Sequence, residues 1–135
     1  MKKKLVLTIL LTLCALIGMA FAKPKRLMVL NHAGFDLSGG RVKITATFTN
    51  LTKKPLGNIY LGFKCVDAAG SPVVGDEEQI TKPGQKIAPR VPASFSFTSD
   101  SAVSVEKIKA CACTLSVERG GQRLDQDTYS VQIQQ

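Results

Sequence analysis

The sequence predicts an all-β fold, an antiparallel sandwich of about six to eight short strands. Three observations lead to this prediction. Apolar and polar residues alternate in several segments, and turn-forming residues recur after roughly every 8–12 residues. Beyond the N-terminal apolar run, no long segment carries apolar residues at the spacing of a helix.

The clearest strand is predicted over residues 41–51, RVKITATFTNL, where apolar side chains share one face and polar side chains share the other. Gly39 and Gly40 break the chain before it, and the turn-forming stretch TKKPLGN follows it. Residues 73–92 are expected to be loop-rich, with at most a short strand at their start and another near Ile80. Other strands are expected over 26–37, 58–68, 93–99, 104–118 and 128–134, with a hairpin turn at 118–123.

Two of these strands carry further expectations. The alternation in 93–99 predicts that Phe95 and Phe97 are buried. In 104–118, Lys107 and Lys109 have the same parity as the apolar residues that follow, so a bulge or an exposed strand end is expected near 107–109.

The chain begins with the pattern of a secretory signal peptide. Three lysines precede an apolar run from Leu5, and the run ends in the small-x-small site Ala-Phe-Ala at 20–22. This predicts a leader over 1–22, cleaved after Ala22, and an exported domain over 23–135 in the bacterial periplasm or at the cell surface. An uncleaved anchor is the alternative, since the run is close to the minimum of about 17 residues for a membrane span. Membrane contact is expected only through such an uncleaved leader.

The sequence has 18 lysines and arginines against 10 aspartates and glutamates, so the chain is basic. Outside the leader, this surplus is scattered over an N-terminal arm, a turn and a strand. Nucleic-acid-binding proteins concentrate their charge on one face among aromatic side chains. We therefore expect no nucleic-acid partner, and we interpret the surplus as solubility with at most a weak attraction to anionic lipid or glycan.

Two stretches carry a resemblance to a known family. The first, GRVKITATFTNLTKKPLGNIYLGFKCVDAAGSPV at 40–73, has an alternating strand ending in Asn50, a polar turn and a second strand before a glycine turn. The second, KPGQKIAPRVPASFSF at 82–97, leads from a Pro-Gly turn into alternating phenylalanines. Residues 40–117 resemble the FxLYD-type immunoglobulin-like domains of exported prokaryotic proteins, although Val66 stands where the family has an aromatic residue. The resemblance implies an immunoglobulin-like sandwich with an accessory binding role and no shared catalytic residues.

Three cysteines outside the leader are expected to face the core. Cys65 lies on the apolar face of its predicted strand, and Cys111 and Cys113 share the apolar face of theirs. If these strands are antiparallel neighbours, or face each other across the sandwich, Cys65 falls nearer to Cys111 than to Cys113. We therefore predict a Cys65–Cys111 disulfide, with Cys113 left as a buried free thiol or an intermolecular partner.

A thiolate metal site is the sharper alternative for these cysteines. The three sulfur atoms, together with Met28 or His32, would suit copper(I) or zinc. This site is less favoured because C-x-x-C spacing is absent and because an exported protein would have to keep its thiols reduced. A further reading leaves all three thiols free and packed in the core. Because the disulfide is favoured over a metal site, we expect no bound metal and no other cofactor.

Other polar residues give weaker signals. His32, the only histidine, lies near Asp36, but no nucleophile motif accompanies them, so a polar residue at a strand end is expected. The Asp-Glu-Glu run at 76–78 lacks the spaced carboxylates of a calcium loop and is interpreted as a solvated loop. We interpret Lys-Pro-Gly-Gln at 82–85 as a turn, and the glycosylation-like Asn-Leu-Thr at 50–52 as the end of a strand.

These patterns favour a non-catalytic function. The preferred hypothesis is an exported module that binds a protein, glycan or other envelope component through its loops or through an unpaired edge strand. The alternative is a metal-handling protein that uses Cys65, Cys111 and Cys113. No catalytic residue is predicted.

Overall fold

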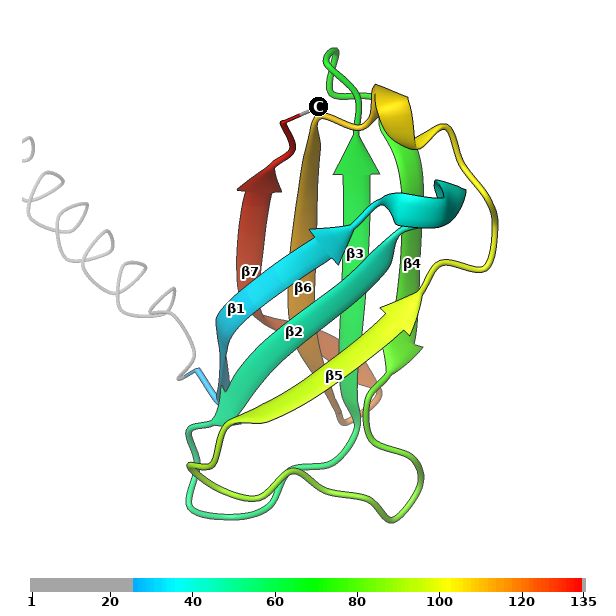
Figure 1. Ribbon diagram of the computed structural model, residues 1–135. Helices are drawn as coiled ribbons and strands as arrows, with labels where there is room; N and C mark the ends of the chain where they lie inside the picture. Colours follow the sequence, from blue (N-terminus) through cyan, green and yellow to red (C-terminus); the bar gives the residue numbers. More distant parts are fainter. Residues whose placement is uncertain (1–25, 135) are drawn as a thin grey trace, which may run out of the picture.

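The computed structural model describes residues 26–134, which form seven strands and two short 3-10 helices (Figure 1). The predicted leader over 1–22 lies outside the described residues. Within the part of the chain that the structure describes, no helix is long and apolar enough to cross a membrane. The elements are β1 (Met28–Asp36), η1 (Ser38–Gly40), β2 (Lys43–Asn50), β3 (Ile59–Val66), β4 (Pro72–Gln79), β5 (Ala93–Thr98), η2 (Val105–Lys107), β6 (Ala110–Arg119) and β7 (Gln122–Gln132).

The strands form two antiparallel sheets that face each other, with the orders β1-β2-β5 and β4-β3-β6-β7 (Figure 1). The predicted all-β, immunoglobulin-like sandwich is therefore confirmed. Constant-type immunoglobulin domains place their fourth strand beside the fifth. Here β4 instead pairs with β3, in the other sheet, and this leaves β5 at the edge of its own sheet.

The core lies between the sheets, where the predicted alternation places apolar side chains. In β2 and at its start, the inward residues are almost completely buried, as are their counterparts in β3 and β6. The Phe63 ring connects the two layers, because its centroid lies 5.7 Å from that of Phe97 and 6.3 Å from that of Phe35. Burying each such large apolar side chain contributes about 1.5–3 kcal/mol to the free energy of folding. The inward residues of these three strands are Val42, Ile44, Ala46, Phe48, Ile59, Leu61, Phe63, Cys65, Cys111, Cys113, Leu115 and Val117.

The predicted strand over 104–118 is too long at its N-terminal end. Residues Val105–Lys107 form η2, and β6 begins only at Ala110. Ile108 is fully buried, whereas Lys107 and Lys109 on either side of it are exposed. Lys107 and Lys109 have the parity of Cys111 but cannot enter the core, so β6 begins only after them. This agrees with the exposed strand end expected near 107–109.

The stretch 73–92 contains more strand than expected. Pro72–Gln79 pairs with β3 along its whole length, so the acidic run at 76–78 lies in a strand rather than in a loop. The prediction failed because β4 is an edge strand with few buried side chains, and its sequence therefore lacks a clear apolar alternation. In β5, Phe97 is buried as predicted, whereas Phe95 is only half-buried.

The hairpin turn at 118–123 is confirmed. Gly120 and Gly121 connect β6 to β7 with φ angles of 58° and 78°, which suit a two-residue hairpin turn that needs positive φ at both positions. β7 begins at Gln122, earlier than the expected 128. Its first four residues are exposed, and Leu124 is the single apolar residue among them, so they pair with β6 without an apolar alternation that would predict a strand.

Candidate functional site

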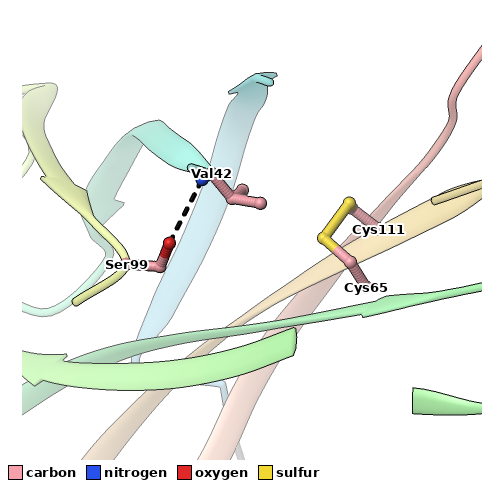
Figure 2. Close-up of a disulfide and its surroundings, with 4 residues drawn as sticks. All are labelled: Val42, Cys65, Ser99 and Cys111. Carbon is pink, nitrogen blue, oxygen red and sulfur yellow. Dashed lines mark hydrogen bonds between the residues drawn. A yellow bond between two sulfur atoms is a disulfide. The ribbon is translucent and has the colours of Figure 1, made fainter. Parts of the chain in front are cut away.

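The Cys65–Cys111 disulfide joins β3 to β6 within the four-stranded sheet (Figure 2). The two residues are direct partners in the antiparallel register, and their Cα atoms are 4.1 Å apart. The predicted Cys65–Cys111 pairing is therefore confirmed. The two strands are antiparallel neighbours in one sheet and do not face each other across the sandwich. Both cysteines are buried, and the side chain of Val42 at the start of β2 points toward them from the facing sheet.

Cys113 keeps a free thiol, two residues along the same face of β6. Its register partners are Phe63 and Tyr129, so no cysteine lies opposite it. Burial, and then the charge of Asp127, raise the pKa of the Cys113 thiol to about 12. The thiol is therefore protonated at neutral pH, and it is neither an activated nucleophile nor a ready metal ligand.

The residues proposed for a metal site do not come together as one. The disulfide bonds two of the three sulfur atoms to each other, which removes them as thiolate ligands. Within residues 26–134, no three histidine, cysteine, aspartate or glutamate side chains are grouped so that they could hold a metal ion. The metal-handling alternative therefore lacks its ligand set in this oxidised structure.

His32 and Asp36 have separate partners. His32 lies within β1 next to a bulge, rather than at a strand end, and its Nδ1 atom is 3.3 Å from the Tyr129 hydroxyl. Asp36 accepts a hydrogen bond from the Ser38 N–H at 2.9 Å, which lowers the pKa of its carboxyl group. The two side chains therefore do not form the base and orienting group that nucleophilic catalysis needs.

The acidic run at 76–78 cannot gather its carboxylates around one ion, because successive side chains of a strand point to opposite faces. Glu77 forms an ion pair with Arg123, whose guanidinium carbon lies 3.5 Å from the centroid of the Tyr60 ring. The Tyr60 hydroxyl donates to Glu118 at 3.2 Å, and burial, followed by this carboxylate, raises the pKa of Tyr60. This cluster connects all four strands of the larger sheet.

The turn at 82–85 and the strand end at Asn50 have structural roles. In the turn, the Gln85 N–H donates to the Lys82 carbonyl at 2.8 Å. Asn50 is fully buried, and its side-chain amide donates to the carbonyl oxygens of Lys54 at 2.8 Å and Ile87 at 3.0 Å. The amide is thus enclosed by the loops that it connects.

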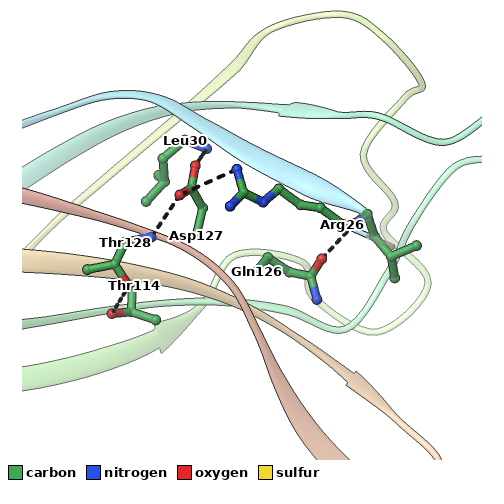
Figure 3. Close-up of polar contacts among 7 residues, drawn as sticks. Arg26, Leu30, Thr114, Gln126, Asp127 and Thr128 are labelled. Atoms are coloured by element: carbon green, nitrogen blue, oxygen red, sulfur yellow. Dashed lines mark hydrogen bonds and ion pairs between the residues drawn. The ribbon is translucent and has the colours of Figure 1, made fainter. Parts of the chain in front are cut away.

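The β1 and β7 edges of the sandwich are closed against each other (Figure 3). The Leu30 N–H donates to the Asp127 carboxylate at 2.7 Å, and the Leu27 N–H donates to the Gln126 side-chain oxygen at 2.7 Å. Arg26 lies 3.9 Å from the same Asp127 carboxylate. The Asp127 side chain therefore occupies the outward N–H of Leu30, which an added strand would need.

The β4 edge is protected by charge. It carries Asp76, Glu77 and Glu78 in succession, and Pro72 at its start has no N–H to donate. Charged residues and proline are the devices by which edge strands resist pairing with other chains.

The β5 edge has neither kind of protection. Its six residues, ASFSFT, include no charge and no proline, and no strand among residues 26–134 pairs with it on the side away from β2. The Ser99 N–H donates to the Val42 carbonyl at 2.8 Å, so the alternation of an antiparallel ladder directs the backbone groups of Phe97 and Phe95 toward β2. The N–H and C=O groups of the three exposed residues between and beside them, Ser94, Ser96 and Thr98, then point to the open edge.

Comparisons with known proteins support the fold and assign no family or function. No protein-family model matches the chain, and no curated protein sequence is significantly similar to it. Among solved structures, the C-terminal domain of wzt superposes with a TM-score of 0.53 at 8% identity, over 84% of this chain and 77% of that one. A penta-heme cytochrome c552 from Thermochromatium tepidum gives the same TM-score and identity over 80% of this chain, which spans 39% of the cytochrome. The resemblance to FxLYD-type domains stays a prediction.

Proposed function

We propose that residues 23–135 form an exported, non-catalytic binding module that captures an extended peptide segment of an envelope protein at the β5 edge. The observation that carries this proposal is the difference among the sheet edges. The Asp127 side chain of β7 occupies the Leu30 N–H of β1, β4 is acidic, and β5 is uncharged with its outward backbone groups open. An extended peptide that adds a strand to such an edge gains main-chain hydrogen bonds without any change in the fold.

The chemistry of the edge defines the segment that it would accept. Ser94, Ser96 and Thr98 together offer three donors and three acceptors, and each hydrogen bond contributes about 0.5–1.5 kcal/mol net. Ordering the peptide offsets part of this gain, so we expect affinities in the micromolar range. On the inner side the half-buried Phe95 would contact an apolar side chain, whereas the outer side presents hydroxyl groups. A suitable segment therefore alternates apolar and small polar residues and lacks proline.

Two features support export. The N-terminal pattern at 1–22 is that of a cleaved signal peptide. The Cys65–Cys111 bond is of a kind that persists in oxidising compartments such as the periplasm or the cell surface. We therefore include in the proposal that the domain lies in the periplasm or at the cell surface.

The test is a pair of substitutions at Ser96. Peptides are first selected from a displayed library against residues 23–135, and their dissociation constants are measured by fluorescence anisotropy. Ser96→Pro removes one outward N–H and places a ring in the path of the added strand, and we expect it to weaken binding about tenfold or more. Proline is tolerated where the N–H of an edge strand faces solvent, so the fold should be retained.

Ser96→Ala is the matched control, since it removes the hydroxyl group and leaves the backbone N–H in place. We expect it to bind the selected peptides as the parent domain does. Equal binding by Ser96→Pro, with an unchanged circular dichroism spectrum, would place the peptide elsewhere and overturn the proposal. Failure to select any peptide would also count against it.

A further inference from the structure

One end of the sandwich carries a concentration of positive charge, which we call the basic tip. It consists of the β2–β3 loop, residues 51–58, and the β4–β5 loop, residues 80–92, which lie together at the bottom of Figure 1. The two loops contain no aspartate or glutamate. Their basic residues, all exposed, are Lys53, Lys54, Lys82, Lys86 and Arg90.

Backbone hydrogen bonds hold the two loops together as one surface. Leu56 and Ile87 exchange two such bonds, at 3.1 and 2.7 Å, and the Arg90 N–H donates to the Asn50 carbonyl at 2.8 Å. The Leu51 N–H donates to the carbonyl of Leu27, which precedes β1, at 2.8 Å. The two loops therefore form one connected surface, and Leu27 lies beside it.

The tip also exposes two of the large apolar side chains of the described chain. Leu51 is 42% exposed and Val91 is 58% exposed. An exposed apolar side chain alone is ordinary, but two of them in loops that carry basic and no acidic residues suit an interface between water and lipid.

The opposite end of the sandwich has a mixed charge. Its loops carry Asp67, Asp100 and Glu106 together with Lys107 and Lys109. Basic residues also lie elsewhere in the described chain, but the two loops of the tip contain basic residues and no acidic residue. Glu118 adjoins the tip, because its N–H donates a hydrogen bond to the Asn58 carbonyl. Its carboxylate accepts a hydrogen bond from the Tyr60 hydroxyl.

We propose that the basic tip docks on the surface of an anionic phospholipid membrane, with Leu51 and Val91 inserted among the headgroups. Each lysine or arginine near an anionic bilayer strengthens binding roughly fivefold, and a cluster of four to eight is typical of such surfaces. Reversible binding to an anionic surface is strengthened both by buried apolar area and by electrostatic attraction, and the tip offers both. This surface is separate from the β5 edge, which leads away from the tip, so either proposal can fail alone.

The test measures sedimentation of residues 23–135 with vesicles of phosphatidylglycerol and phosphatidylethanolamine, and with vesicles of phosphatidylcholine alone. We expect binding to the anionic vesicles only, weakened by salt. The double substitution Lys53→Glu/Lys86→Glu should weaken this binding by about twentyfold or more. The control Lys107→Glu/Lys109→Glu makes the same change of net charge at the opposite end and should have a small effect.

Insertion can be followed separately because the chain contains no tryptophan. A tryptophan introduced by Val91→Trp should shift its fluorescence to shorter wavelength when anionic vesicles are added. The same residue introduced by Ala102→Trp, at the opposite end, should not shift.

Three results would overturn the inference. The first is that the parent domain does not bind anionic vesicles at all. The second is that both double variants lose binding equally, which would indicate net charge rather than the tip. The third is that a soluble polyanion such as heparin binds the tip while vesicles do not, which would assign the surface to an anionic glycan.

Discussion

Residue register decides the different fates of three cysteines that face the same core. Cys65 and Cys111 are direct partners across two antiparallel strands, so their side chains start from backbone positions only 4.1 Å apart. Cys113 shares the face of Cys111, but its partner on β3 is Phe63. A shift of two residues along β6 thus decides whether a cysteine forms the disulfide, as Cys111 does, or stays a buried free thiol, as Cys113 does.

The raised pKa of Cys113 predicts a specific dependence of stability on pH. An unfolded thiol has a pKa of about 8.5, so above that pH the unfolded chain loses a proton that the folded chain keeps up to about 12. The stabilisation is present in full below the unfolded pKa and is lost as the pH rises toward the folded pKa. Between about pH 8 and about pH 10, the free energy of unfolding should fall by about 2 kcal/mol more in the parent than in Cys113→Ala.

Urea unfolding of both proteins at the two pH values checks this prediction. The cavity left by Cys113→Ala lowers stability at both pH values alike, so only the difference between them is informative. An identical pH dependence in the two proteins would mean that Cys113 ionises in the folded state as readily as in the unfolded chain.

At the scale of elements, the disulfide fastens β3 to β6, the two central strands of the larger sheet. It closes a loop with a sequence separation of 46 residues, for which the chain-entropy estimate is about 4 kcal/mol. Cys65→Ala/Cys111→Ala should therefore lower the free energy of unfolding by about that amount, measured by urea unfolding at neutral pH.

Cys113→Ala serves here as the control, because it removes a buried sulfur atom and retains the cross-link. Its intact mass should be two hydrogens below that of the fully reduced chain. A double variant as stable as this control would show that the cross-link adds little to the sheet.

The inner strands and the edge strands β1 and β5 could be predicted from sequence, whereas most of β4 and the first half of β7 could not. Alternation over 41–51 and in the strand of Cys65 predicted the core correctly, because those strands bury one face and expose the other. The sequence predicts only a short strand at the start of 73–92 for β4 and misses the first half of β7, because these segments bury few apolar side chains and pair mainly through backbone groups. The open side of β5 depends on β4 joining the other sheet, which no local pattern of residues records.

Over residues 26–134, the molecule has two ends of different charge and an edge, β5, that carries neither charge nor proline. The basic tip arises because two loops far apart in sequence are held together by bonds around Leu56 and Asn50. The composition gives the excess of basic residues, but only the fold shows that the basic residues of the two loops lie at one end of the sandwich. With the tip on a membrane, the β5 edge would extend away from the bilayer toward partners in the adjacent space.

Amide hydrogen exchange along β5, with and without a selected peptide, tests the central claim most directly. In the free domain, the N–H groups of Ser94, Ser96 and Thr98 should exchange rapidly and those of Phe95 and Phe97 slowly; added peptide should slow the first three. Uniformly slow exchange in the free domain, or protection that appears elsewhere when the peptide binds, would contradict the account.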